Sequence, residues 1–174
     1  RTVERLRELD KLITEMLAFA RGNANLEPVN VNALLEQAAQ WLRPALGTGV
    51  RLTIGTEAPD LTVRGNAPSL VSAVLNLATN ALQAGGPELN IELLARRTPQ
   101  GAAEIRVSDD GPGIAPALRE RVFEPFFTTR ARGNGLGLAI VKSIVEAHRG
   151  HIRLDAGARR GACFVIELPT ELTP

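Results

Sequence analysis

Hydrophobic and polar residues alternate along the chain with two periods, which predict helices in some stretches and strands in others. Over residues 1–22 the apolar side chains recur at steps of three and four, the period of an amphipathic helix. Gly22 ends this pattern, and Pro28 prevents the helix from continuing. We therefore expect an N-terminal helix over residues 1–22, a linker over 23–30 and one domain over 31–170.

Within that domain the same periods predict helices and a set of short strands. The expected helices run from a cap at Asn30 or Asn32 to Leu46, from Ser69 to Ala84 and from Leu136 to Ala147. The expected strands cover residues 50–54, 61–64, 88–96, 103–109, 152–155 and 163–168. Residues 110–134, rich in glycine and proline, predict a long loop with one helical turn near residues 118–122. This order predicts an α/β sandwich, in which a mixed, mainly antiparallel sheet packs on three helices.

The composition excludes several kinds of partner. The 174 residues are 44% hydrophobic, which is enough for one domain with a well-formed core. The formal net charge is only +1, with basic and acidic residues dispersed, so neither nucleic acid nor an anionic membrane is an expected partner. The sequence has no run of the roughly 18 apolar residues that span a membrane, and its single cysteine, Cys163, is interpreted as a small buried hydrophobe. We expect a cytoplasmic fragment of a longer protein.

A stripe of polar side chains lies on the otherwise apolar helix predicted over residues 69–84. Ser72, Asn76 and Asn80 are spaced by four and share one face. A buried amide without a hydrogen-bond partner costs roughly 1–3 kcal/mol, so this face must meet something polar. Either neighbouring backbone satisfies the two amides, which is the better interpretation of this helix alone, or an amide oxygen binds Mg²⁺ together with water and phosphate oxygens.

A carboxylate and two glycines follow the strand predicted over residues 103–109. Asp109 ends the strand, and Gly111 and Gly113 come directly after it. This pattern is typical of a simple Asx-type turn. It also suits a binding site in which Asp109 accepts a hydrogen bond from a flat base while the glycines let the backbone approach a ligand closely.

A run of glycines opens directly into the last predicted helix, over residues 133–137. The start of a helix offers free backbone N–H groups and the positive end of a dipole, which favours phosphate. The run is not a P-loop, which needs the pattern G-x-x-x-x-G-K-S/T. It is not a dinucleotide-binding fingerprint either, because Ile140 stands where the last glycine of that fingerprint belongs. Arg130 and Arg132 lie just upstream and either contact phosphate oxygens or remain solvated loop arginines.

In this order, these elements resemble the catalytic ATP-binding domain of the two-component sensor histidine kinases of bacteria. The family's N, G1, F and G2 boxes match residues 76–81, 109–113, 123–127 and 133–137. Residues 1–22 resemble the second helix of the family's dimerisation hairpin, so the likeness covers nearly the whole chain. Residues 80–84 and 126–129 are similar to the soluble branch that regulates nitrogen use or flagella.

The resemblance implies a GHKL ATPase fold with a Bergerat-type ATP site. In such a site Asp109 reads the adenine amino group, Asn80 holds Mg²⁺ and Asn76 lies near the phosphates, while residues 111–137 close as a lid. Asn76 and Asn80 would be the catalytic residues, and the positions expected to contact ATP are Asn76, Asn80, Asp109, Gly111, Gly113, Ile114, Phe126, Thr129, Arg130, Gly133, Gly135, Leu136, Gly137 and Leu138.

The resemblance also implies a route for the phosphoryl group. The γ-phosphate would pass to a histidine on the first hairpin helix and then to an aspartate of a response-regulator receiver domain. The hairpin helices would join two copies of the full-length protein in a homodimer. Catalysis would consist mainly of positioning and charge neutralisation.

The chain departs from the family pattern at several positions. The sequence contains no phosphoacceptor histidine followed by Glu or Asp, and His148 and His151 are interpreted as structural. Ser72 stands where the family often has Glu or Gln, which leaves the general base open. Residues 159–162 replace a Gly-x-Gly-Thr motif, so a threonine contact near the adenine is missing, and Arg130 replaces a lysine.

Two other functions stay open on the sequence. One is a different ATPase of the same fold, such as an anti-sigma kinase, a DNA-repair or topoisomerase ATPase, or a chaperone. The other is a nucleotide-sensing interaction module that transmits ATP occupancy without phosphorylating anything. The F box and the N-terminal helix favour the histidine kinase, because those relatives require neither feature.

Overall fold

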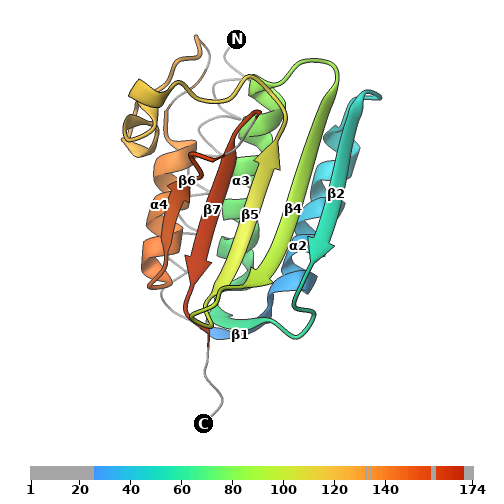
Figure 1. Ribbon diagram of the computed structural model, residues 1–174, viewed down its shortest axis with the longest axis vertical. Coiled ribbons are helices and arrows are strands. Elements are labelled where there is room, and N and C mark those ends of the chain that lie inside the picture. Colours follow the sequence, from blue (N-terminus) through green and yellow to red (C-terminus); the bar gives the residue numbers. More distant parts are fainter. Residues whose placement is uncertain (1–25, 132, 134, 158–159, 171–174) are drawn as a thin grey trace, which may run out of the picture.

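The computed structural model describes residues 26–131, 133, 135–157 and 160–170. Figure 1 shows two layers, with a five-stranded sheet in front and helices behind it. The predicted α/β sandwich is therefore confirmed, while the helix expected over residues 1–22 lies outside the described residues. None of the described helices is both long and apolar enough to cross a membrane.

The main sheet has the strand order β2-β4-β5-β7-β6. Its strands are β2 (Val50–Thr56), β4 (Leu89–Arg97), β5 (Ala103–Asp109), β6 (His151–Leu154) and β7 (Cys163–Leu168). β2 pairs parallel with β4 and the remaining neighbours pair antiparallel, so the sheet is mixed and mainly antiparallel, as expected. β5 lies at its centre and ends at the top of Figure 1, where it delivers Asp109.

The helices on this sheet are α2 (Val31–Leu42), α3 (Ala67–Ala84) and α4 (Gly137–Ala147). Asn30 caps α2 and Asn66 caps α3, because each side chain accepts a hydrogen bond from a backbone N–H three residues later. α2 ends earlier than predicted, since Pro44 has no N–H to donate and the chain tightens into a 3-10 turn over Arg43–Ala45. α3 ends and α4 begins at the same end of the molecule as Asp109 (Figure 1).

A second, two-stranded sheet ties the start of the domain to its middle. β1 (Glu27–Asn30) pairs antiparallel with β3 (Thr62–Gly65), and Val63 of β3 also bridges Thr170. We expected a linker here, and β1 was not predicted because Pro28, one of its four residues, argues against a strand. Proline is tolerated in a short pair where its missing N–H can face solvent.

One continuous core lies between the sheet and the helices. Ile91, Ile105 and Ile166 from the strands meet Leu35 of α2 and Leu77 of α3, and each is at most 1% exposed. Burying such a side chain stabilises the fold by about 1.5–3 kcal/mol. This packing fixes α3 against the centre of the sheet, and so fixes the amides of α3 relative to Asp109.

The sheet face away from the helices carries a buried carboxylate. The Glu104 side chain, 3% exposed, accepts hydrogen bonds from Arg96 Nε at 2.7 Å and Arg106 Nη1 at 3.2 Å. Arg106 also pairs with Asp155. Burial alone would raise the pKa of the Glu104 carboxyl, but the hydrogen bonds and charges of the two arginines outweigh it and lower this pKa.

Cys163 is buried, as expected, but on this same outer face. Its neighbours Phe164 and Ile166 belong to the core cluster, whereas the Cys163 side chain meets the Ser108 hydroxyl, which donates to Sγ at 3.2 Å. A thiol is compatible with the polar neighbour Ser108 on this face of the sheet because its sulfur accepts weak hydrogen bonds.

Candidate functional site

The polar stripe of α3 faces the start of α4. Asn76 Nδ2 donates to the Ser72 carbonyl at 3.0 Å, so the helix itself satisfies this side of the amide. Asn76 Oδ1 points to the first turn of α4, where it lies 3.8 Å from the position that a Cβ on Gly137 would occupy. The helix backbone therefore satisfies the Asn76 nitrogen, while the Asn76 oxygen is aimed at the glycine run.

One turn later, Asn80 meets the loop. Its Oδ1 accepts a hydrogen bond from Arg130 Nη2, and Gln83 Oε1 accepts one from Arg130 Nη1. Within the loop, the Arg130 backbone N–H donates to Thr128 Oγ1 at 3.1 Å. The structure thus joins two expected site residues, Asn80 and Arg130, that lie 50 positions apart.

Asp109 lies at the end of β5 with its carboxylate held by backbone donors. Oδ1 accepts from the Gly111 N–H at 2.9 Å and from the Ala162 N–H at 3.4 Å. Burial raises the pKa of the Asp109 carboxyl, and these two hydrogen bonds only partly offset that effect. Among the described residues both donors use Oδ1, which leaves Oδ2 to accept from a ligand.

The neighbouring carboxylate behaves differently. Asp110 is partly exposed, and its two oxygens accept from the Asn90 backbone N–H at 2.8 Å and from Asn90 Nδ2 at 2.7 Å. These hydrogen bonds lower the pKa of Asp110, whereas the pKa of Asp109 is raised. Asp110 therefore closes the turn, and Asp109 is the carboxylate offered to the site.

Glycine is required where this turn meets the loop before β7. Gly113 has φ +76° and Gly161 has φ +72°, a region that disfavours other residues. A Cβ on Gly161 would lie 1.8 Å from the Asp109 carbonyl oxygen, and one on Gly113 would lie 2.8 Å from that of Gly161. We did not predict Gly161 as a site residue. The signal was its place directly before Ala162, within residues 159–162, which replace the family's Gly-x-Gly-Thr motif.

The F box and the glycine run fold onto each other. The Phe126 N–H donates to the Gly135 carbonyl at 2.9 Å, and Gly135, at φ +71°, would place a Cβ only 2.3 Å from the Phe126 backbone. Phe126 itself has φ +66° and is 74% exposed, so the ring faces solvent. Gly133 packs its backbone near Thr128 Oγ1.

The remaining expected residues lie at the edges of this arrangement. Ile114 and Leu138 are half-buried against the core, whereas Thr129 is exposed on the loop surface. α4 begins at Gly137 after Leu136, whose side chain, unlike those of Asn30 and Asn66, cannot accept a hydrogen bond. The first turn of α4 therefore lacks the amide cap that α2 and α3 have.

Comparison with known proteins decides the family. A family model described as histidine kinase-, DNA gyrase B-, and HSP90-like ATPase matches residues 65–172. The chain belongs to this ATPase family.

Individual relatives of this ATPase domain are sensor kinases. It is 41% identical to the sensor protein kinase FleS of Pseudomonas aeruginosa over 97% of its own length and 42% of FleS. Among solved structures it is similar to the mycobacterial sensor histidine kinase MprB, with 32% identity and a TM-score of 0.73 over 82% of this chain and 97% of that one. Full-length ShkA in complex with AMPPNP is 31% identical, with a TM-score of 0.78 over 93% of this chain and 36% of that one.

These likenesses confirm the prediction of a histidine kinase ATP-binding catalytic domain with the GHKL fold. The chain spans only 35–42% of the length of the curated relatives ZraS and FleS.

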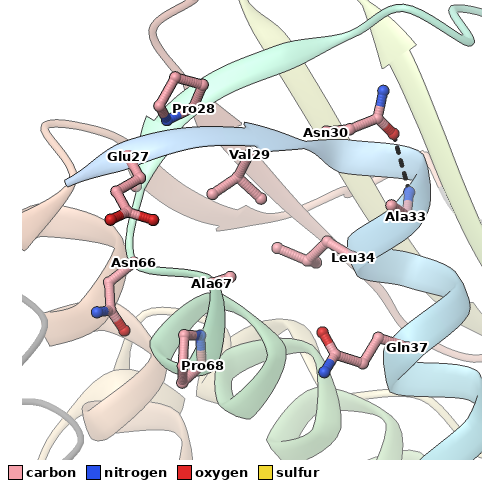
Figure 2. Close-up of a pocket in the computed structure, with 11 residues that line it drawn as sticks. Glu27, Pro28, Val29, Asn30, Ala33, Leu34, Gln37, Asn66, Ala67 and Pro68 are labelled. Carbon is pink, nitrogen blue, oxygen red and sulfur yellow. Dashed lines mark hydrogen bonds between the residues drawn. The ribbon is translucent and has the colours of Figure 1, made fainter. Parts of the chain in front are cut away.

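A cavity of about 410 Å³ in the ATPase domain lies away from these residues. Figure 2 shows it between β1 and the first turns of α2 and α3, with Glu27, Asn30, Gln37 and Asn66 around it. It is lined by none of the positions expected to contact ATP. Because Asp109, Asn80 and the start of α4 meet at the other end of the helices, we place the functional site there.

The residues at that end fit ATP and Mg²⁺. Asn80 Oδ1 already accepts from a cationic group, the Arg130 guanidinium, so this oxygen is oriented to meet positive charge. The described residues contain no group of three His, Cys, Asp or Glu side chains that would hold a metal by themselves. A Mg²⁺ ion here would therefore take most of its roughly six ligands from water and phosphate oxygens, which is its usual preference.

Proposed function

We propose that this domain binds Mg²⁺·ATP and transfers the γ-phosphate to a histidine of a dimerisation hairpin, from which it passes to an aspartate of a response-regulator receiver domain. The observation that carries the proposal is that three parts lie at one end of the fold, namely Asp109, the amides of α3, and the start of α4 with Arg130. Each part has the chemistry that one portion of ATP requires.

The adenine would bind at Asp109. Its carboxylate has one oxygen held by Gly111 and Ala162, and the other oxygen can accept from the exocyclic amino group of adenine. Guanine carries a carbonyl oxygen at that position and would repel the carboxylate, so this contact favours adenine. Gly113 and Gly161 adopt φ angles that favour glycine, and their lack of a side chain lets the base approach the backbone closely.

The phosphates would bind between α3 and α4. Asn76, Arg130 and the backbone N–H groups at the start of α4 surround this position, and the positive end of the helix dipole favours the negative charge. Asn80 would hold Mg²⁺, which, when bound, neutralises charge on the β- and γ-phosphates. The residues of this chain then supply position and charge.

The acceptor histidine would lie on another part of the parent protein. His148 is only 4% exposed, and both of its ring nitrogens are engaged, with Nε2 accepting from the Asn66 N–H and Nδ1 donating to the Ile144 carbonyl. His151 lies at the start of β6, with its Nε2 atom 3.3 Å from Glu167 Oε2. We propose that residues 1–22 form the second hairpin helix, that the hairpin makes the homodimer, and that the parent protein acts in the cytoplasm.

Labelled ATP tests this proposal directly. The chain is incubated with γ-³²P-ATP, Mg²⁺ and a separate protein that carries the complete hairpin. We expect label on the hairpin histidine, in a linkage that acid removes, and about tenfold to a hundredfold less at subsaturating ATP when Asp109→Asn replaces the wild-type chain. Nucleotide binding without transfer to any hairpin offered would instead identify a sensing module.

A further inference from the structure

The guanidinium of Arg130 spans two amide oxygens on one face of α3. Nη2 donates to Asn80 Oδ1 and Nη1 donates to Gln83 Oε1. Residues three apart on a helix are neighbours, and the planar fork of an arginine presents parallel donors at this spacing. Among the described residues no carboxylate pairs with Arg130, so these two amides are its side-chain partners.

We infer that Gln83 is a positioning residue that holds Arg130 on Asn80, so that Arg130 and Mg²⁺ are alternative occupants of the Asn80 amide oxygen. The inference rests on the proposed function and adds to it a residue with a defined effect on metal binding. Gln83 would act through Arg130 and would touch neither the metal nor the nucleotide.

The two occupants exclude each other for electrostatic and steric reasons. A Mg²⁺ ligand must lie about 2.0–2.1 Å from the metal in near-octahedral geometry, which leaves no room for a guanidinium on the same oxygen. Two cations that share one oxygen also repel each other, and no described carboxylate pairs with Arg130 to offset that repulsion. Mg²⁺ therefore reaches Asn80 only after Arg130 leaves it.

The contact is weak enough to exchange. Gln83 is exposed and Asn80 and Arg130 are only half-buried, so water competes for every group in the pair. Loss of the Gln83 acceptor removes one of two hydrogen bonds that hold the guanidinium and raises the fraction of molecules in which Asn80 is available. The apparent affinity for Mg²⁺ rises in proportion to that fraction, because only these molecules can bind the metal at Asn80.

The adenine end gives an internal reference. Asp109 is held by Gly111 and Ala162, and among the described residues none of its hydrogen bonds involves Gln83 or Arg130. Adenosine, which has no phosphates and recruits no metal, is therefore expected to bind equally well whether the Arg130 contact is intact or absent.

The test compares Gln83→Ala with Gln40→Ala, which removes an amide from α2 that is also exposed. Calorimetry measures the affinity of a non-hydrolysable ATP analogue with Mg²⁺ and with EDTA, and the ratio of the two constants reports the gain from metal. We expect Gln83→Ala to increase this ratio about threefold to tenfold, the worth of one hydrogen bond, and Gln40→Ala and adenosine binding to be unchanged.

A double-variant cycle assigns the effect to Arg130. In an Arg130→Ala background the same Gln83→Ala change should leave the ratio unaltered, because no guanidinium remains to be held. An equal ratio in Gln83→Ala and wild type, or an effect that persists without Arg130, would overturn the inference. Failure of the wild-type chain to bind adenosine or the analogue in either buffer would instead overturn the proposed function, and this inference with it.

Hydrogen exchange tests the contact without any nucleotide. The amides of residues 127–130 should exchange faster in Gln83→Ala than in wild type or Gln40→Ala, because the loop loses an anchor on α3. Identical exchange in all three proteins would show that Gln83 does not hold the loop.

Discussion

At the scale of single residues, the site depends on one carboxylate with an unusual environment. Asp109 is half-buried and its pKa is raised, so the folded protein stabilises the neutral carboxyl relative to the charged one. For such a group the folded state binds the proton more tightly than the unfolded state. The free energy of unfolding therefore falls as pH rises from the unfolded pKa near 3.8 to the higher folded pKa. The charged form of Asp109 therefore lowers the free energy of unfolding.

Replacement of Asp109 by Asn should separate binding from stability. The neutral amide of Asp109→Asn cannot offer the charged acceptor, so we expect ATP affinity to fall about tenfold to a hundredfold, the worth of a hydrogen bond to a charged group. Thermal unfolding at pH 7 should show equal or greater stability, since the costly charge is gone. In the wild type, ATP binding should weaken as acidification protonates Asp109. This loss should begin at a pH above 3.8, the ordinary pKa of an aspartate, because the pKa of Asp109 is raised. Equal affinity of variant and wild type at pH 7 would remove Asp109 from the site.

Gly161 should be sensitive to the smallest possible substitution. Gly161→Ala places a Cβ 1.8 Å from the Asp109 carbonyl oxygen at φ +72°, and we expect a loss of at least about 2 kcal/mol in urea unfolding, with weaker ATP binding. Gly47→Ala is the matched control, because nothing lies within 4 Å of its Cβ, and its effect should stay within about 0.5 kcal/mol. Equal stability of the two variants would contradict this close approach.

The sequence predicted Asp109, Gly111 and Gly113 as one turn but not the backbone that meets it. Gly161 approaches Asp109 from the loop before β7, where Ala162 lies 53 positions from Asp109, and no periodicity links the two segments. Local patterns identify residues that shape their own turn, whereas a contact between β5 and the loop before β7 follows from strand pairing, which a single sequence leaves open.

At the scale of elements, periodicity was a good guide to the helices and the long strands. The amide stripe of α3 was predicted because its spacing of four is visible against an apolar helix. β1 was missed because it contains Pro28, whereas the equally short β3 was predicted. The end of α2 was misplaced because the apolar pattern continues to Leu46, while Pro44 disrupts the helix hydrogen bonds.

The outer face of the sheet contributes stability through Glu104. Its pKa is lowered, so its stabilising effect is present above the unfolded value near 4.5 and is lost as pH falls through the lower folded value. We expect Glu104→Gln to destabilise the domain by about 1–2 kcal/mol at pH 7, since Arg96 and Arg106 lose a charged acceptor. The difference from wild type should shrink below about pH 4.

Urea unfolding at both pH values measures this effect. Glu92→Gln on β4 is the control, because Glu92 is exposed on the same face and should change stability by less than about 0.5 kcal/mol. A Glu104→Gln variant as stable as the Glu92→Gln variant at pH 7 would show that the arginines do not depend on this carboxylate.

At the scale of the whole molecule, the sequence predicts that residues 1–22 form an amphipathic helix with an apolar stripe and no partner of its own. Such a helix is marginal alone, so we expect it to drive self-association. The complete chain should therefore have a larger mass by light scattering than a chain that begins at residue 23. The shorter chain should still unfold cooperatively and bind ATP. Equal masses at all concentrations would contradict a dimerising role.

The two ends of the domain converge on one strand. β3 has Val29 of β1 on one side and Thr170 on the other, both opposite Val63. In Figure 1 this junction lies at the bottom, and Asp109 with the start of α4 lies at the top. The described chain therefore enters and leaves the domain at one pole, so that a segment joined to either end is tethered on the side away from Asp109.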